Sequence, residues 1–185
     1  MNVGLDGVPA PIDNYRQSGF ALAYRNIRFG GLAGGPIDYG GQRIRQLSSA
    51  DLDYVVSLDR EVFPAARNAF LRSWLTLPES HALGLNDDGV LTGYGVIRRC
   101  RSGYKIAPLV AGSEPAAHTL FRALTSRVEA GAPVFLDVPE VNKPAIGLAE
   151  EYGMTPAFET ARMYNEGEPS LRLDKVYGVT TFELG

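Results

Sequence analysis

Two aspartates stand at matching places in a short sequence that occurs twice. VGLDGVP, Val3 to Pro9, matches VFLDVP, Val134 to Pro139, so Asp6 and Asp137 each end a strand-like stretch. A carboxylate at the end of a strand can bind a cationic group or cap the following helix or turn, and both roles stay open. Internal repetition of this kind indicates a duplicated unit of which one copy is only partly present.

Basic residues gather near the end of another strand-like stretch. Arg98, Arg99 and Arg101 are close in sequence to Lys105, and together they could bind an anionic ligand. A charge run of this kind is also typical of a solvated turn. The sequence alone leaves both interpretations open.

Arg162 and Tyr164 lie on a predicted strand, 157–164, and are candidates for lining a cleft. If Arg162 points inward it needs a partner, because an unpaired buried charge is costly. A single cysteine, Cys100, excludes an internal disulfide. The two histidines have no cysteine nearby, which argues against a zinc site.

The composition favours one folded core. The chain has 185 residues, of which 45% are hydrophobic and 21% charged, enough for one complete domain and a fragment. A net charge of -3 argues against nonspecific nucleic-acid binding. The N-terminus lacks the features of a signal peptide, and no apolar run reaches the roughly 18 residues of a membrane span. We expect a cytoplasmic protein with neither nucleic-acid nor membrane partners.

Hydrophobic periodicity and capping signals predict alternating strands and helices. Ser48 with Asp51 forms a capping box, Asp87-Asp88-Gly89 forms a hairpin turn, and Ser113 caps the helix that follows. The expected strands are 44–47, 81–86, 90–98, 104–110, 134–138, 157–164 and 176–184. Helices are expected after Ser48, before Pro78 with Phe70, Leu71, Trp74 and Leu75 on one face, after Ser113, and from Asn142 to Tyr152. Because a helix joins the strand ending at Val110 to the strand starting at Val134, we expect these two to be parallel and splayed apart.

Residues 30–42, GGLAGGPIDYGGQ, have the glycine-rich composition of a flexible connector. We therefore predict three parts: a fragment at residues 1–30, a linker at 31–42 and a complete domain at 43–185. The fragment has too little apolar surface to fold alone, so we expect it to dock on a sheet edge of its own chain or of a second chain, as in a homodimer.

The order of these elements, an α/β arrangement around a mixed sheet, resembles the GNAT acyltransferase fold. NKPAIGLAEEYGM, Asn142 to Met154, is similar to the GNAT motif that contains an asparagine and, seven residues on, a tyrosine. CRSGYKIAPL, FLDVP, ETARMY and VYGVTTFELG resemble more narrowly the C-terminal domain of bacterial tandem-GNAT proteins. By this resemblance, residues 1–30 are the end of a first GNAT domain and residues 43–185 a complete second one.

The resemblance implies acyl transfer from acetyl-CoA to a small-molecule amine. Such a reaction needs a strand edge for pantetheine, a loop at a helix N-terminus for pyrophosphate, a base for the ammonium and an acid for the thiolate. The positions expected at the cofactor are Leu109, Val110, Gly112, Ser113 and Asn142. Those expected at the substrate are Arg101, Lys105, Arg162 and Tyr164, and no metal is expected.

The catalytic candidates are Asp137 and Glu159 for the amine and Tyr15 for the acid of the first copy. The second copy departs from the motif, because Ala149 occupies its tyrosine position and Glu114 lies where a phosphate would approach. Two hypotheses remain. The chain is either a GNAT-type N-acetyltransferase or a catalytically degenerate GNAT-like module that binds a ligand or dimerises.

Overall fold

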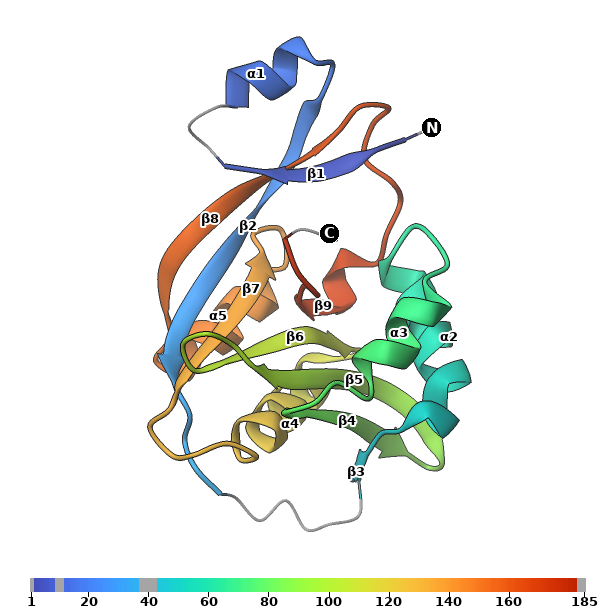
Figure 1. The fold of residues 1–185 in the computed structure, drawn as a ribbon, viewed down its shortest axis with the longest axis vertical. Coiled ribbons are helices and arrows are strands. Elements are labelled where there is room, and N and C mark those ends of the chain that lie inside the picture. Colours follow the sequence, from blue (N-terminus) through green and yellow to red (C-terminus); the bar gives the residue numbers. More distant parts are fainter. Residues whose placement is uncertain (1, 9–11, 37–42, 183–185) are drawn as a thin grey trace.

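The computed structural model describes residues 2–8, 12–36 and 43–182. Its strands form one mixed sheet in the order β1-β8-β2-β7-β6-β5-β4-β3, and β9 pairs with β6 off this path (Figure 1). The strands are β1 Gly4–Gly7, β2 Ala21–Leu32, β3 Ile44–Gln46, β4 Ser80–Asp87, β5 Val90–Arg99, β6 Tyr104–Ala111, β7 Pro133–Pro139, β8 Thr155–Tyr164 and β9 Val176–Gly178. The helices are α1 Ile12–Gln17, α2 Leu52–Val62, α3 Asn68–Trp74, α4 Glu114–Thr125 and α5 Lys143–Glu151, with short 3-10 turns at Ser49–Asp51 and Leu173–Lys175.

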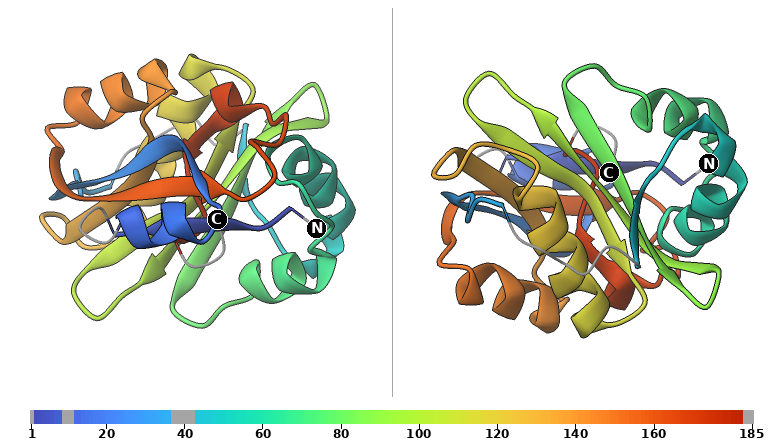
Figure 2. Two further views of the ribbon diagram at one scale, coloured as in Figure 1. Left: turned by 90° about the horizontal axis from the view of Figure 1, so that it is seen from above. Right: turned by 90° about the horizontal axis from the view of Figure 1, so that it is seen from below.

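Helices cover both faces of the sheet (Figure 2). Apolar residues of α4 and α5 form one core against one face, and those of α2 and α3 form a second core against the other. Neighbouring residues of β6 serve both, since Leu109 belongs to the first core and Val110 to the second. The predicted mixed α/β sheet is therefore confirmed.

The local signals read from the sequence set the element ends. Ser48 and Asp51 form the reciprocal capping box, Ser113 caps α4, and Asn142 caps α5. The turn between β4 and β5 places Asp88 and Gly89 at φ 49° and 83°, which suits the twist of an antiparallel hairpin. Short-range chemistry thus accounts for most of the boundaries.

Strands β6 and β7 are parallel and diverge, as predicted. They pair only from Tyr104–Val134 to Ile106–Leu136. Beyond this point β6 continues along β9, with Leu109 opposite Gly178 and Val110 opposite Val176. The divergence leaves a wedge between β6 and β7, and the chain's own residues 176–178 lie in it (Figure 1).

The two long strands β2 and β8 pair around a local two-fold axis. The pair Tyr24–Arg162 is repeated by Phe158–Arg28, and the pair Ala21–Tyr164 by Thr155–Gly30. Residues 21–30 of β2 therefore correspond to the residues 134 positions later in β8. The axis passes between Asn26 and Thr160, which face each other.

The same symmetry relates the strands that carry the repeated sequence. β1 pairs with the C-terminal part of β8, and β7 pairs with the C-terminal part of β2. Asp6 lies opposite Arg162 in the first pairing, and Asp137 lies opposite Arg28 in the second. The two copies of the sequence repeat thus have the same structure. The long strand of each copy pairs with the short strand of the other, β2 with β7 and β8 with β1.

Two expectations differ from the structure in detail. The N-terminal segment docks within its own chain, but only β1 lies at a sheet edge, because β2 is inserted between β7 and β8. β2 also continues to Leu32, two residues into the predicted linker, of which residues 37–42 lie outside the described residues. The last strand ends at Gly178 because Val179 turns its backbone N–H onto the Asp137 carbonyl (2.8 Å); residues 183–184 of the expected strand are not described.

Candidate functional site

The wedge between β6 and β7 is where the sequence placed the cofactor. Leu109 and Val110 lie on the β6 edge, both buried, and both are paired with β9. Gly178 of β9 fits closely there, because a Cβ on this residue would come 2.6 Å from Leu136 Cδ1 and 3.3 Å from Leu109 Cβ. The β6 edge is therefore filled by protein backbone.

The loop before α4 was expected to hold a pyrophosphate. Gly112 donates its backbone N–H to the Thr92 carbonyl (3.1 Å), and the Ser113 hydroxyl accepts from Ala116 N (3.4 Å). Glu114 and Pro115 follow at the first two helical positions. A carboxylate at a helix N-terminus repels an anion, and proline lacks an N–H. The loop is therefore a capped helix start whose first turn disfavours a bound anion.

Asn142 caps α5 and also anchors the C-terminal segment. Its Oδ1 accepts from Ala145 N (3.2 Å). Its Nδ2 donates to the carbonyls of Leu173 (3.1 Å), Asp174 (3.2 Å) and Val176 (2.9 Å). The asparagine that was expected to contact the cofactor instead faces residues 173–176.

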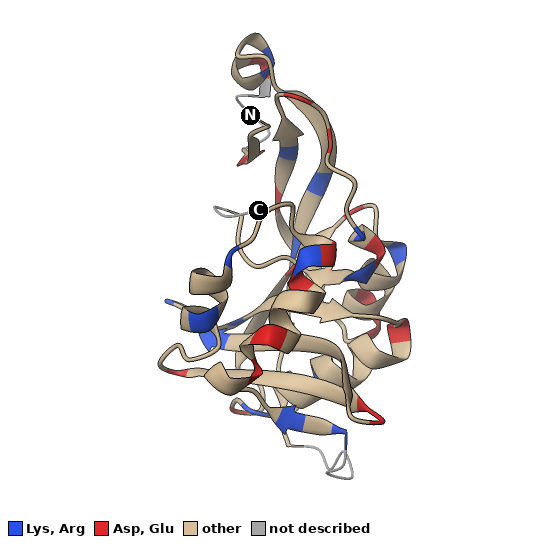
Figure 3. Cartoon of the chain, turned by 90° about the vertical axis from the view of Figure 1, so that its right-hand side faces the viewer, with Lys and Arg blue, Asp and Glu red and all other residues tan. Residues whose placement is uncertain are grey.

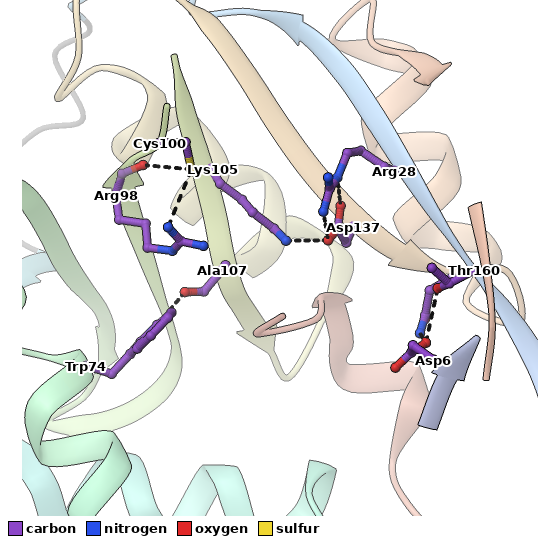
Figure 4. A network of polar contacts seen from close by, with 10 residues as sticks. Asp6, Arg28, Trp74, Arg98, Cys100, Lys105, Ala107, Asp137 and Thr160 are labelled. Atoms are coloured by element: carbon purple, nitrogen blue, oxygen red, sulfur yellow. Dashed lines mark hydrogen bonds and ion pairs between the residues drawn. The ribbon is translucent and has the colours of Figure 1, made fainter. Parts of the chain in front are cut away.

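Asp137 lies fully buried at the centre of a polar network (Figure 4). Arg28 of β2 binds its two oxygens through Nε (2.7 Å) and Nη2 (2.9 Å), and Lys105 of β6 binds Oδ2 through Nζ. Phe182 covers both cations, with its ring centre 4.8 Å from Arg28 Cζ and 5.2 Å from Lys105 Nζ. Burial lowers the pKa of the Lys105 ammonium, whereas the charge of Asp137 opposes that shift. Both carboxylate oxygens are therefore engaged, and neither is free to take a proton from a substrate.

Asp6 occupies the symmetry-related position and is also fully buried. Its carboxylate accepts from Arg162 Nη1 (2.6 Å), Asn26 Nδ2 (2.7 Å) and Thr160 Oγ1 (3.1 Å). Arg162 Nε donates in turn to the Tyr164 hydroxyl (3.0 Å). The sequence required a partner for an inward-pointing Arg162, and the partner is Asp6.

A narrow pocket opens where this network meets the α2–α3 side of the molecule. Its polar side chains include Tyr24, Arg67, Arg162 and Tyr164, and Val176 and residues 178–180 form part of its wall. Burial is the largest cause that raises the pKa of the Tyr24 hydroxyl far above its ordinary value, and the neighbouring Tyr164 adds to the shift. Two of the expected substrate residues, Arg162 and Tyr164, thus lie together in one pocket.

The other candidates lie elsewhere. Arg101 is exposed in the bend between β5 and β6, and Lys105 is buried against Asp137. Glu159 pairs with Ile27, one residue from the Arg28–Asp137 pair. Because successive residues of a strand point to opposite faces, Glu159 and Asp137 lie on opposite faces of the sheet.

Glu159 is 43% exposed and forms an ion pair with Arg25 (3.5 Å). Tyr15 lies on α1 in the N-terminal segment, and its ring packs against Gly7 of β1. The structure therefore does not gather Asp137, Glu159 and Tyr15 at one catalytic centre.

Sequence reasoning missed a second buried ion pair beside the pocket. Arg67 binds Asp59 through Nε (2.9 Å) and Nη2 (2.7 Å), and Nη2 also contacts Thr180 (3.1 Å). The Tyr94 hydroxyl donates to Asp59 Oδ1 (2.9 Å). A signal was present, because Asp59 interrupts the apolar face of α2. The remote partners Tyr94 and Thr180 could not be inferred from it.

The distribution of charged residues and the possible metal ligands point to no further site among the described residues. Acidic and basic residues are interspersed along the elements in the view of Figure 3. The described residues contain no group of His, Cys, Asp and Glu that could hold a metal ion. No helix within the described ranges combines the length and apolar character that a membrane span requires.

Comparison with known proteins identifies the family. The model of the family described as an acetyltransferase (GNAT) domain matches residues 55–178. The chain therefore belongs to the GNAT acetyltransferase family. A holothin acyltransferase from Pseudoalteromonas sp. (strain SANK 73390) is 29% identical over 185 residues, covering 100% of this chain and 62% of that protein.

Solved structures support the same fold. A crystal structure described as that of a candidate acetyltransferase from Pyrococcus horikoshii has a TM-score of 0.81 at 22% identity, covering 100% of this chain and 60% of that one. A GCN5-related N-acetyltransferase from Sphaerobacter thermophilus has a TM-score of 0.61 at 12% identity, covering 99% of this chain and 62% of that one. The chain thus spans about three fifths of the length of these relatives.

GNAT acetyltransferases use acyl-CoA, so the wedge can be tested for its fit to that cofactor. A pantetheine arm needs the free β6 edge, and β9 occupies it. A pyrophosphate needs free donors at the start of α4, where Glu114 and Pro115 stand. The residues present in the wedge do not fit acyl-CoA.

Proposed function

We propose that this chain serves GNAT-type acyl transfer from an acyl-CoA, such as acetyl-CoA, to a small-molecule amine. In this proposal residues 43–185 are the second of two GNAT units, and residues 1–32 are the closing strands of the first. The relatives that cover the whole chain are longer than it is, which supports a two-unit protein. The name of the Pseudoalteromonas protein gives holothin as its acceptor, and at 29% identity we carry over only the reaction class.

One observation carries the two-unit proposal, the exchange of β2 and β8 about the axis between Asn26 and Thr160. On the side of the second unit, β7 has β6 beside it, and Lys105 of β6 reaches Asp137. On the other side, β1 is an edge strand of the described sheet. In this proposal a strand of the first unit lies beside β1, in the role that β6 has beside β7.

The pocket lined by Tyr24, Arg67, Arg162 and Tyr164 is our candidate for the acceptor site. Tyr24 of the first copy and Arg162 and Tyr164 of the second copy all line it, so in this proposal both units contribute to the acceptor site. The Asp6 and Asp59 carboxylates compensate its two arginines, which favours an uncharged amine over a strongly anionic acceptor. The chemical step then belongs to the first unit, because the wedge of the second has no free base.

The test is a thiol-release assay on the protein isolated from its source organism with an antibody against this chain. We expect the isolated protein to contain a first GNAT unit and to release CoA from acetyl-CoA when a suitable small amine is added. The same chain produced alone should release none. Native protein that contains no further GNAT unit, or that fails to release thiol with a broad amine panel, would contradict the proposal.

A variant separates acceptor binding from cofactor binding in the same assay. Tyr164→Phe removes the hydroxyl that accepts from Arg162 (3.0 Å), so we expect a higher KM for the amine and an unchanged KM for acyl-CoA. Tyr104→Phe is the matched control, because its hydroxyl donates to Glu129 (2.8 Å) at the surface. Equal effects of the two variants would remove the pocket from the proposal.

A further inference from the structure

Residues 173–181 form a segment that runs through the wedge of the second unit. β9 pairs with β6 at Leu109 and Val110. On the opposite side, Val179 donates its backbone N–H to the Asp137 carbonyl of β7 (2.8 Å). The segment therefore bridges two strands that have diverged from each other, and it satisfies backbone groups on both.

The side chains of this segment belong to the core. Tyr177 is 3% exposed and packs in the core formed with α4 and α5, while Val176 and Val179 belong to the core under α2 and α3. Burial raises the pKa of the Tyr177 hydroxyl, and the charge of Glu114 raises it further. Tyr177 thus lies near the start of α4, where a bound pyrophosphate would have to lie.

The Asn142 side chain fixes the segment from the α5 end. Its amide nitrogen is shared among the carbonyls of Leu173, Asp174 and Val176. Asn142 is only 3% exposed, so releasing these carbonyls would leave a buried donor unsatisfied, which is costly. Removing the segment would also expose Val176, Tyr177 and Val179 to water.

Pantetheine and residues 173–181 would compete for the same hydrogen-bonding edge and the same volume. We infer that this segment is a built-in replacement for the cofactor, held permanently by Asn142, and that the unit formed by residues 43–185 does not bind acyl-CoA. The inference rests on the proposed function, because the thioester must then come from the first unit. It turns Asn142 from a cofactor ligand into a positioning residue for the chain's own C-terminal segment.

The test combines calorimetry with hydrogen exchange on the full 185-residue chain. We expect no binding of acetyl-CoA or CoA at about 1 mM, and exchange in a peptide covering residues 173–182 as slow as in β6, with or without acetyl-CoA. If acetyl-CoA or CoA binds and exchange in this peptide becomes faster, the segment is displaceable. If the cofactor binds and exchange in this peptide stays slow, the cofactor binds elsewhere. Either result overturns the inference.

Asn142→Asp tests the anchor itself. Aspartate keeps the oxygen that caps α5 and removes the nitrogen that holds the three carbonyls. We expect exchange in residues 173–182 to accelerate about tenfold or more, since several hydrogen bonds are lost together. Ser126→Ala, which removes a hydroxyl bonded to the Ala123 carbonyl (2.8 Å) at the far end of α4, is the control and should leave this peptide unchanged. An unchanged rate in Asn142→Asp would overturn the role given to Asn142.

The outcomes for the two proposals are distinguishable. Thiol release by the native protein, combined with absence of acetyl-CoA binding by this chain, supports both. Thiol release by this chain alone overturns the inference about the segment and leaves the reaction class intact. Absence of release by the native protein contradicts the proposed function whatever the segment does.

Discussion

At the scale of single residues, the repeated aspartates are structural. Asp137 and Asp6 are fully buried, and each has an arginine from the other copy's long strand as its partner. Two buried charges that neutralise each other and share further donors are stable together, but either one alone is costly. The buried arginine partners therefore account for an aspartate in each copy without a role in proton transfer.

We predict that Asp137→Asn strongly destabilises the protein. The substitution leaves Lys105 and Arg28 without their carboxylate, so we expect the free energy of unfolding to fall by about 3–5 kcal/mol. Urea unfolding followed by circular dichroism measures it. Arg172→Ala is the control, because its ion pair with Asp174 has side chains 56% and 62% exposed and should contribute less than about 1 kcal/mol. Similar losses in both variants would contradict the network.

A second residue-scale prediction concerns alkaline pH. Burial, with the charge of Asp59, raises the pKa of the Tyr94 hydroxyl well above its ordinary value of 10.0. Above about pH 10 the unfolded chain therefore loses this proton while the folded chain keeps it, so stability falls as pH rises, by up to about 1.4 kcal/mol per pH unit. Below pH 10 the contribution is fully present.

Tyr94→Phe removes this titration, so the variant should lose less stability than the wild type between about pH 9 and pH 11 in urea unfolding. Tyr54→Phe is the control, because Tyr54 is 58% exposed. Its stability should change with pH as that of the wild type does. If Tyr94→Phe shows the same pH dependence as the wild type, another group is responsible for the loss.

The sequence identified Asp6, Asp137 and Arg162 as candidate site residues, but it did not predict which side chains they contact. Arg162 needed a partner, and the repeat singled out the aspartates, yet in both arginine–aspartate pairs the two residues come from strands more than 100 residues apart. Arg28 was not among the candidates, because nothing local distinguishes it from the other arginines. Long-range register decides these contacts, and a single sequence does not contain it.

At the scale of elements, local chemistry was a good guide and strand order was not. The caps at Ser48 and Ser113 follow from neighbours within three residues, so the sequence predicts them. The position of β2 inside the sheet, and of β9 in the wedge, depends on packing against strands formed elsewhere. The sequence indicated strands in both places but not their neighbours.

A pair of glycines tests how tightly the β5–β6 turn is packed. Both Gly103 and Gly131 have positive φ, 71° and 77°. A Cβ at Gly103 would lie 2.2 Å from the Pro133 carbonyl oxygen, whereas at Gly131 it would meet nothing within 4 Å. A substitution by alanine therefore strains the backbone at both glycines, but only at Gly103 does the added Cβ also clash with a neighbour.

We expect Gly131→Ala to cost about 1–2 kcal/mol from the left-handed backbone alone, and Gly103→Ala to cost clearly more, because the turn must also move away from β7. Thermal and urea unfolding of the two variants measure the difference. Equal losses would show that the contact between this turn and the start of β7 is loose.

At the scale of the whole molecule, the N-terminal segment packs into the domain whose residues 55–178 the family model matches. β2 separates β7 from β8, and its Phe29 is 1% exposed in the core shared with α4 and α5. Residues 1–32 therefore act as a structural partner of residues 43–185, in addition to the role we propose for them in a first unit.

A protein that lacks residues 1–42 should consequently fail to fold as a stable monomer. It would lose the strand between β7 and β8 and the Arg28 partner of Asp137, in a chain whose total stability is expected to be only about 5–15 kcal/mol. Light scattering and circular dichroism should show aggregation or loss of the cooperative transition, and a separate peptide of residues 1–36 should restore the monomeric fold. A scrambled peptide is the control. If the shortened protein is instead a monomer as stable as the intact chain, the segment is an inert tail, and the reciprocal exchange of β2 and β8 has no energetic role.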